Sequence, residues 1–204
     1  MRNSVQPYHT IRPSRLVPNI DGGKLVKLAK TAHNNEAYFT RERAMPVYHI
    51  IVHGFLTWNA DNPKGYYRRG RGRFAAEPKL AAHWERSARF PTLLWSWDDQ
   101  NLLCQTVQET SARRQWTVYA IASQPTHLHI VLAWHTLHPP ERVQQTLKQM
   151  MSLALGSIHG RGRRWFSRNG VPQRIKNRTH LRHLLYDYLA NQAVIFWRSN
   201  RPVL

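Results

Sequence analysis

Cysteine, acidic residues and long apolar runs are all scarce in this chain. Cys104 is the only cysteine among 204 residues, which excludes an intrachain disulfide and argues against a cysteine-based zinc site. No run of about 18 apolar residues occurs, so no transmembrane helix and no membrane partner are expected. The residues after Met1 do not form the apolar segment of a secretory signal. A reducing, cytoplasmic compartment is therefore expected.

The shortage of acidic residues leaves a large positive charge. The chain contains thirty Lys and Arg residues but only eleven Asp and Glu residues, which gives a formal net charge of +19. Hydrophobic residues make up 42% of the chain and include eight Trp, which favours a globular domain over disorder. A charge of this size attracts polyanions, either nucleic acid or anionic membrane. Arg outnumbers Lys in the basic segments, and its planar fork suits phosphate and bases, so nucleic acid is the favoured partner.

The basic residues suggest a division of the chain. Residues 1–44 are expected to form a basic N-terminal arm, and residues 45–204 one domain with a Gly- and Arg-rich insertion near residues 60–78. Cations and aromatic residues are interleaved in this insertion, and residues 160–178 form a second basic stretch that contains Trp165 and Phe166. The insertion is either a solvated flexible loop or a loop that contacts a nucleic-acid strand, and the second interpretation is favoured. The candidate contact residues are Arg68, Arg69, Arg71, Arg73, Arg161, Arg163, Arg164, Trp165, Arg174 and Lys176.

Hydrophobic patterning predicts an α+β fold. Strands are expected at residues 46–55, 116–123 and 127–134, with a short one near 173–176. Helices are expected at residues 98–113, 141–155 and 179–197. Hairpin-linked strands with crossover helices indicate a ferredoxin-like or RRM-like antiparallel sheet with packed helices.

Two short motifs carry chemistry. His127 and His129 lie two apart on a predicted strand, so both imidazoles face one side and can share a divalent cation. On the last predicted helix, a stripe at 100° spacing contains Leu181, Leu185, Tyr188 and Gln192. Tyr186 lies far from that stripe. Taken alone, the His pair is more simply structural, as are His49 and His53, and Tyr188 is more simply a core aromatic.

Together, the two motifs resemble the HUH single-tyrosine transposases and their REP-associated relatives. The similar stretches are residues 47–55, 115–132 and 165–192, about a quarter of the chain. The resemblance implies that Tyr188 is the nucleophile and that His127, His129 and Gln192 hold Mg²⁺ or Mn²⁺. His can replace Gln at the third ligand position in this family, and Asn191 is a weaker candidate.

The resemblance also implies an activity. Such an enzyme cuts single-stranded or hairpin DNA through a covalent tyrosine–phosphate link, as a monomer or homodimer, in the cytoplasm of bacteria and at the nucleoid. A phenol is a poor nucleophile at neutral pH, and a bound metal polarises the scissile phosphate. Two alternatives remain: a non-catalytic RNA- or DNA-binding protein on the same fold, and a domesticated derivative that cuts repeats without moving itself.

Overall fold

The computed structural model describes residues 45–68, 71–135, 137–168 and 170–200. The chain divides into two units, Met1–Ala37 and Tyr38–Leu204, and every described residue belongs to the second unit. The predicted arm, residues 1–44, and Arg69 lie outside the described residues. The domain boundary predicted at residue 45 therefore stays a prediction.

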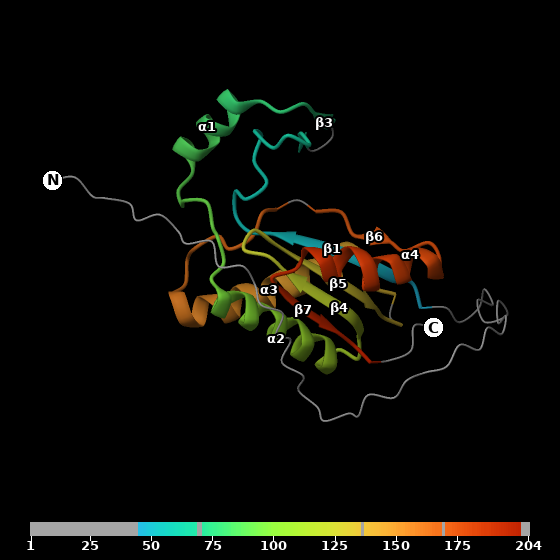
Figure 1. The fold of residues 1–204 in the computed structure, drawn as a ribbon. Coiled ribbons are helices and arrows are strands. Elements are labelled where there is room, and N and C mark those ends of the chain that lie inside the picture. Colours follow the sequence, from blue (N-terminus) through green and yellow to red (C-terminus); the bar gives the residue numbers. More distant parts are fainter. Residues whose placement is uncertain (1–44, 69–70, 136, 169, 201–204) are drawn as a thin grey trace. The chain divides into compact units, whose positions relative to one another are not determined.

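The described part of the chain contains both strands and helices (Figure 1). In chain order they are β1 (Val47–His53), β2 (Tyr66–Arg68), β3 (Gly72–Phe74), α1 (Pro78–Ser87), α2 (Trp97–Arg113), β4 (Thr117–Ser123), β5 (His127–Ala133), α3 (Pro140–His159), β6 (Gln173–Arg174), α4 (Arg178–His183), a π-helical segment (Leu184–Tyr188), α5 (Leu189–Gln192) and β7 (Ile195–Arg198).

The main sheet has five strands in the order β6-β1-β5-β4-β7, and all neighbouring strands are antiparallel. If β7 is left aside and the other four strands of this sheet are numbered along the chain, their order across the sheet is 4-1-3-2. This is the arrangement of a split βαβ unit of ferredoxin-like type, in which α2 crosses from β1 to β4 and α3 from β5 to β6. The predicted α+β fold with an antiparallel sheet and packed helices is confirmed. The β4–β5 pairing contains a register shift between Val118 and Ala120.

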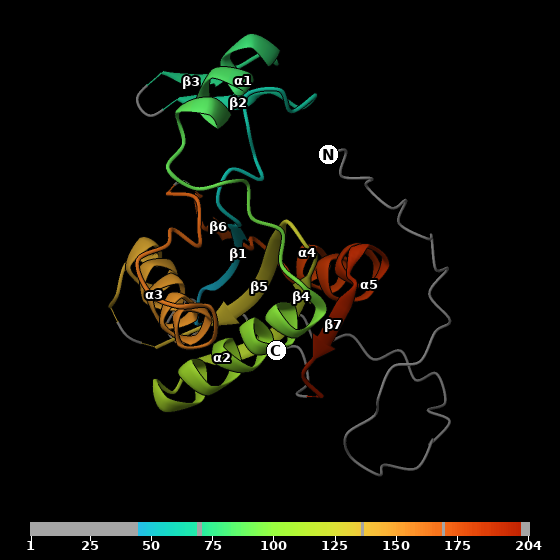
Figure 2. The ribbon, with the colours of Figure 1, turned by 90° about the vertical axis from the view of Figure 1, so that its left-hand side faces the viewer.

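The first face of the sheet packs against α2 and α3. Alternation along β1 and β5 points Ile50, Leu128 and Ile130 to this face, and each is fully buried. The helices contribute Leu103 and Val107 from α2, and Val143, Leu147, Met151 and Leu155 from α3. Figure 2 shows α3 on one side of the strands and α4 and α5 on the other.

The second face of the sheet packs against α4, the π-helical segment and α5. Leu181, Leu184, Leu185 and Leu189 are buried against Val131 and the small residues of β4 and β5. The π-helical segment is closed by a hydrogen bond from the Leu189 amide to the Leu184 carbonyl. A π-turn holds one more residue than an α-turn, so residues after it lag behind regular helical spacing.

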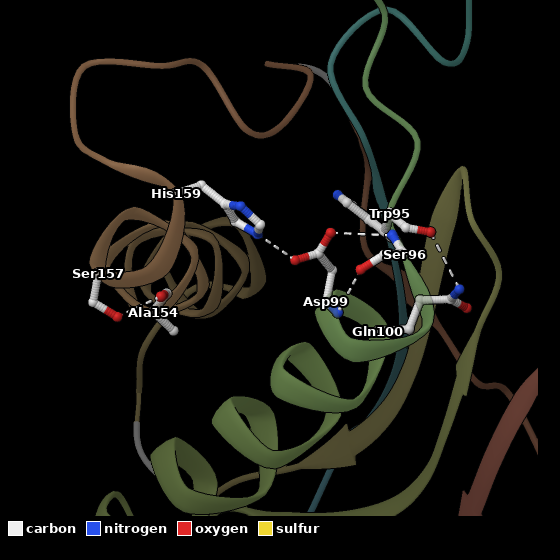
Figure 3. A network of polar contacts seen from close by, with 7 residues as sticks. All are labelled: Trp95, Ser96, Asp99, Gln100, Ala154, Ser157 and His159. Atoms are coloured by element: carbon white, nitrogen blue, oxygen red, sulfur yellow. Dashed lines mark hydrogen bonds and ion pairs between the residues drawn. The ribbon is translucent and has the colours of Figure 1, made fainter.

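A polar network joins the start of α2 to the end of α3 (Figure 3). The Ser96 side chain accepts from the Asp99 amide and the Asp99 carboxylate accepts from the Ser96 amide, which forms a capping box. The Nε2 atom of His159 lies 2.6 Å from Asp99 Oδ1, the carboxylate oxygen that is not bonded to the Ser96 amide. Burial alone raises the pKa of Asp99, but hydrogen bonds from His159 and Ser96 more than offset this effect and lower it.

Three predicted elements differ from the structure. The helix predicted to continue to residue 197 ends at Gln192, because Ala193 is extended and Ile195–Arg198 pairs with β4 as β7. The helix predicted to stop at Gly156 continues to His159, because Gly156 is buried in the helix and the stop comes at Gly160 with φ of 88°. The insertion, predicted to be a loop, contains the β2–β3 hairpin and is followed by α1.

Candidate functional site

Four histidines share one face of the central strand pair. The register of β1 and β5 places His53 opposite His127, and Ile51 opposite His129. His49 and His53 are four residues apart on β1, so they point to the same face. The ring of His49 stacks on that of His129 with 5.1 Å between the ring centroids, and the ring of His53 stacks on that of His127 with 5.4 Å between them. His49 and His53, for which the sequence favours a purely structural role, therefore belong to the same cluster as the predicted pair.

The predicted pair is held by one hydrogen bond at each Nδ1 atom. His129 Nδ1 lies 2.9 Å from His49 Nε2, and His127 Nδ1 lies 2.8 Å from Thr126 Oγ1. The rings of His127 and His129 are 4.7 Å apart. His129 Nε2 is buried, and in the described part of the chain it has no hydrogen-bond partner. A buried nitrogen without a partner fits the position of a metal-binding atom.

Burial keeps these imidazoles uncharged near neutral pH. It lowers the pKa of His129 to about 3, with a smaller contribution from its three His neighbours. Burial also lowers the pKa of His49 to about 4, with a smaller contribution from His180. It lowers the pKa of His53 to about 4, with smaller contributions from His127 and Lys148. The pKa of His127 is lowered by burial and then by Lys64. Neutral imidazole is the form that binds metals.

Tyr188 lies against this cluster. It sits at the end of the π-helical segment, half-buried between the core positions Leu185 and Leu189. Its ring meets the His129 ring edge to face, with centroids 5.9 Å apart at 88°. Tyr186 is 51% exposed, and the Arg198 guanidinium lies 4.3 Å from its ring centre. The predicted separation of the two tyrosines is thus observed, and Tyr188 is the one beside the histidines.

Gln192 lies at the end of α5, near the β4–β5 turn. Its backbone carbonyl accepts a hydrogen bond from the Gln124 side chain, and the Gln124 amide donates to the His127 carbonyl. The Gln192 side chain is exposed. The lag after the π-turn explains why Gln192 leaves the buried stripe that contains Leu181 and Leu185. Its role as a ligand stays a prediction.

The donor atoms of the cluster bear on its ability to hold a divalent cation. Among the described residues, no group of three or more His, Cys, Asp or Glu side chains is arranged to hold a metal ion. The predicted set is of another kind, with two imidazoles and one amide. The unpartnered His129 Nε2 and the ordered Nδ1 atoms fit such a set. Imidazole nitrogen together with oxygen ligands suits Mn²⁺ or Mg²⁺.

The predicted contact residues fall into two groups. The exposed cations are Arg71, Arg73, Arg161, Arg164, Arg174 and Lys176. Arg68 is half-buried, lies over Tyr66 and Phe74, and approaches Glu77 at 3.8 Å. Arg163 is half-buried over Trp165. The exposed cations are therefore more accessible to a phosphate than Arg68 and Arg163 are.

Trp165 is the clearest correction among these residues. It is 5% exposed and packs in the core between the sheet and the two crossover helices. Phe166 beside it is also buried, and its ring meets Trp95 at 5.7 Å. A buried indole presents no face to a base, so the predicted stacking role of Trp165 is wrong. The neighbouring Arg residues do not reveal the direction in which an aromatic side chain points.

The insertion has a small core of its own. Ala60, Tyr66 and Ala81 are buried in it, and Phe74, Leu80 and Trp84 pack around them. Tyr66 donates a hydrogen bond of 2.7 Å to Glu77. Tyr67, the next residue, is 62% exposed. Of these two neighbouring tyrosines, Tyr66 is thus part of the small core and Tyr67 is accessible.

Similarity to known proteins is limited to structure. No protein-family model matches the chain, and no curated protein matches it. The solved structures that are similar include two at 13% identity. A REP-associated tyrosine transposase bound to a REP hairpin has a TM-score of 0.40, covering 75% of this chain and 70% of that one. A protein described as a "putative transposase" from Deinococcus radiodurans R1 has a TM-score of 0.39, covering 76% and 98%.

The helices also bear on membrane insertion. Within the described ranges, no helix combines the length and the apolar character needed to cross a membrane.

Proposed function

We propose that this chain is a divalent-metal-dependent endonuclease and strand transferase, of transposase type, that acts on single-stranded or hairpin DNA with Tyr188 as its nucleophile. The observation that carries the proposal is the contact of Tyr188 with His129, 5.9 Å between ring centroids, next to His127. A phenol beside two oriented, neutral imidazoles on a rigid strand is a suitable arrangement for attack on a phosphate.

The reaction exchanges one phosphodiester for another. The Tyr188 oxygen attacks phosphorus and forms a new O–P bond while the bond to one deoxyribose oxygen breaks. The phenol loses its proton, and the leaving oxygen gains one. Since the tyrosine–phosphate bond retains the energy of the cut strand, rejoining needs no nucleotide cofactor.

The metal-binding residues would be His127, His129 and Gln192. A bound Mg²⁺ or Mn²⁺ would polarise the scissile phosphate and stabilise the charge that develops on it. The residues themselves have separate tasks. Thr126 and His49 orient the two imidazoles, and Leu185 and Leu189 hold Tyr188 against them.

The partner is proposed to be single-stranded or hairpin DNA. The six predicted contact residues that are exposed would contact phosphates: Arg71, Arg73, Arg161, Arg164, Arg174 and Lys176. The hairpin preference rests on the resemblance of the two motifs to the transposase family. An oligomeric state of one or two copies fits the proposal, and the tyrosine can act within its own subunit or across a dimer.

The test is a search for the covalent adduct. The full chain is incubated with an end-labelled hairpin oligonucleotide and Mn²⁺, and a denaturing gel reports protein-linked DNA. Wild-type protein should form the adduct and Tyr188→Phe should not, because only the nucleophilic oxygen is removed. Tyr186→Phe is the matched control, since Tyr186 is exposed and turned away. A normal adduct yield in Tyr188→Phe would refute the assignment.

The metal requirement is tested in the same assay. His127→Ala, His129→Ala and addition of EDTA should each eliminate the adduct. Persistent cleavage in EDTA would show that the histidines are structural. DNA binding by the wild-type chain without any adduct would favour the alternative of a non-catalytic nucleic-acid-binding protein.

A further inference from the structure

His49 makes a specific contact with the site through a hydrogen bond that spans 80 positions of sequence. Its Nε2 atom lies 2.9 Å from His129 Nδ1, and both side chains are at least 95% buried. The two rings are nearly parallel, with 20° between their planes. In the β1–β5 register, His49 is opposite Val131 and thus diagonal to His129, a separation that aromatic rings can bridge.

The contact permits two proton arrangements with different consequences. If His49 donates, the proton of neutral His129 is at Nε2, which is then a buried donor without a partner in the described part of the chain. If His129 donates from Nδ1, its Nε2 carries a lone pair. Only the second arrangement allows Nε2 to bind a cation. The neighbouring His127 has the same pattern, since its Nδ1 is held by Thr126.

We propose that His49 is a positioning residue, which accepts a hydrogen bond from His129 Nδ1 and so fixes the tautomer and ring plane that present His129 Nε2 to the metal. The metal part of this inference rests on the proposed function. The tautomer part concerns the metal-free chain alone. Metal-binding histidines commonly have their other nitrogen held in this way, and here the acceptor is a second buried imidazole.

The first experiment reads the tautomer directly. Long-range ¹H–¹⁵N spectra of the ¹⁵N-labelled, metal-free full chain near pH 7 distinguish Nδ1–H from Nε2–H imidazole. Wild-type His129 should be the Nδ1–H form. His49→Leu should lose the preference, and His49→Gln should restore it, because the Gln side-chain oxygen accepts in a similar position. His53→Leu is the matched control, since it removes an imidazole from the same strand and face without touching the His49–His129 bond.

The second experiment measures Mn²⁺ binding by calorimetry or electron paramagnetic resonance. His49→Leu should weaken the affinity by about 10- to 100-fold, the usual effect of losing such a partner, and His49→Gln should recover most of it. Circular dichroism verifies folding of each variant, and His49→Gln keeps the test valid if His49→Leu does not fold.

The two proposals fail in different ways. An Nε2–H form of His129 in the wild-type chain, or an unchanged tautomer in His49→Leu, would overturn the positioning role. Loss of the tautomer preference in His49→Leu supports that role even if the chain forms no DNA adduct, in which case only the proposed nuclease activity is refuted.

Discussion

The charge distribution predicts how the proposed binding to DNA depends on salt. Cations that contact phosphates release counterions, so the logarithm of the affinity falls linearly with the logarithm of the salt concentration. Six of the predicted contact residues are exposed: Arg71, Arg73, Arg161, Arg164, Arg174 and Lys176. Arg68 and Arg163 are omitted because the first approaches Glu77 and the second is half-buried over Trp165.

The expected slope follows from this set. Six phosphate contacts give a slope of about −4 for single strands and about −5 for duplex. A fourfold rise in salt should then lower the affinity by about 300-fold for a single strand and about 2,000-fold for a duplex stem. Fluorescence anisotropy with a labelled single strand and with a labelled duplex, each titrated at several salt concentrations, measures the two slopes.

A pair of charge-matched variants tests which residues contribute. The double variant Arg161→Gln/Arg164→Gln should reduce the slope on single strands by about 1.4, since each lost contact accounts for about 0.7. The control Arg113→Gln/Arg142→Gln also removes two exposed charges, but from α2 and α3 outside both basic segments, and should leave the slope unchanged. Equal slopes for the two double variants, or affinity insensitive to salt, would refute the reasoning.

Three further outcomes follow from the core, the polar network and the proposed metal site. Trp165→Ala should lower the free energy of unfolding by about 3–5 kcal/mol, because it empties a core position, and a urea titration that shows wild-type stability would contradict its burial. Asp99→Asn should cost about 1 kcal/mol at neutral pH. Because folding lowers the pKa of Asp99, its contribution to stability is complete above its pKa in the unfolded chain and is lost as pH falls through its pKa in the folded chain. The melting temperature of the variant should therefore approach that of wild type below about pH 4. A difference in melting temperature that stays the same below this pH would contradict the prediction. Gln192→Leu should weaken Mn²⁺ binding and adduct formation, whereas Asn191→Leu should not; the reverse result would move the third ligand to Asn191.

Much of the fold is readable from local patterns because each element has a strong local signal. The β-branched and aromatic residues of β1, the acidic start of α2 and the Pro-initiated α3 all agree with their tertiary environment. The strand β7 is missed because its apolar residues also continue the helical pattern, and only the extended Ala193 separates the two elements. The helix α1 lies just after the Gly- and Arg-rich stretch and is missed because it contains few apolar residues, of which Leu80, Ala81 and Trp84 pack in the small core.

The site is half readable for a related reason. His127 and His129 are neighbours on one strand, so their shared face follows from alternation alone. The approach of His49 to His129 depends on a pairing between strands 80 positions apart. A signal for it does exist in the sequence: the first and third strands of a ferredoxin-like sheet are neighbours, and two histidines four apart on the first strand share one face. These two facts must be combined to predict the cluster, and neither motif does so alone.

The hydrophobic cores on the two faces of the sheet fix the positions of the histidines and of Tyr188 in the candidate site. On β5, Leu128 and Ile130 are buried in the first core, while Val131 and Ala133 are buried in the second. A shift of one residue in the register would turn every one of these side chains to the wrong face, so His127 and His129 are fixed as strictly as the sheet itself. Tyr188 belongs to a different element, and Leu185 and Leu189 anchor that element to the same second core. The distance between Tyr188 and the histidines is therefore set by the packing of the residues around them.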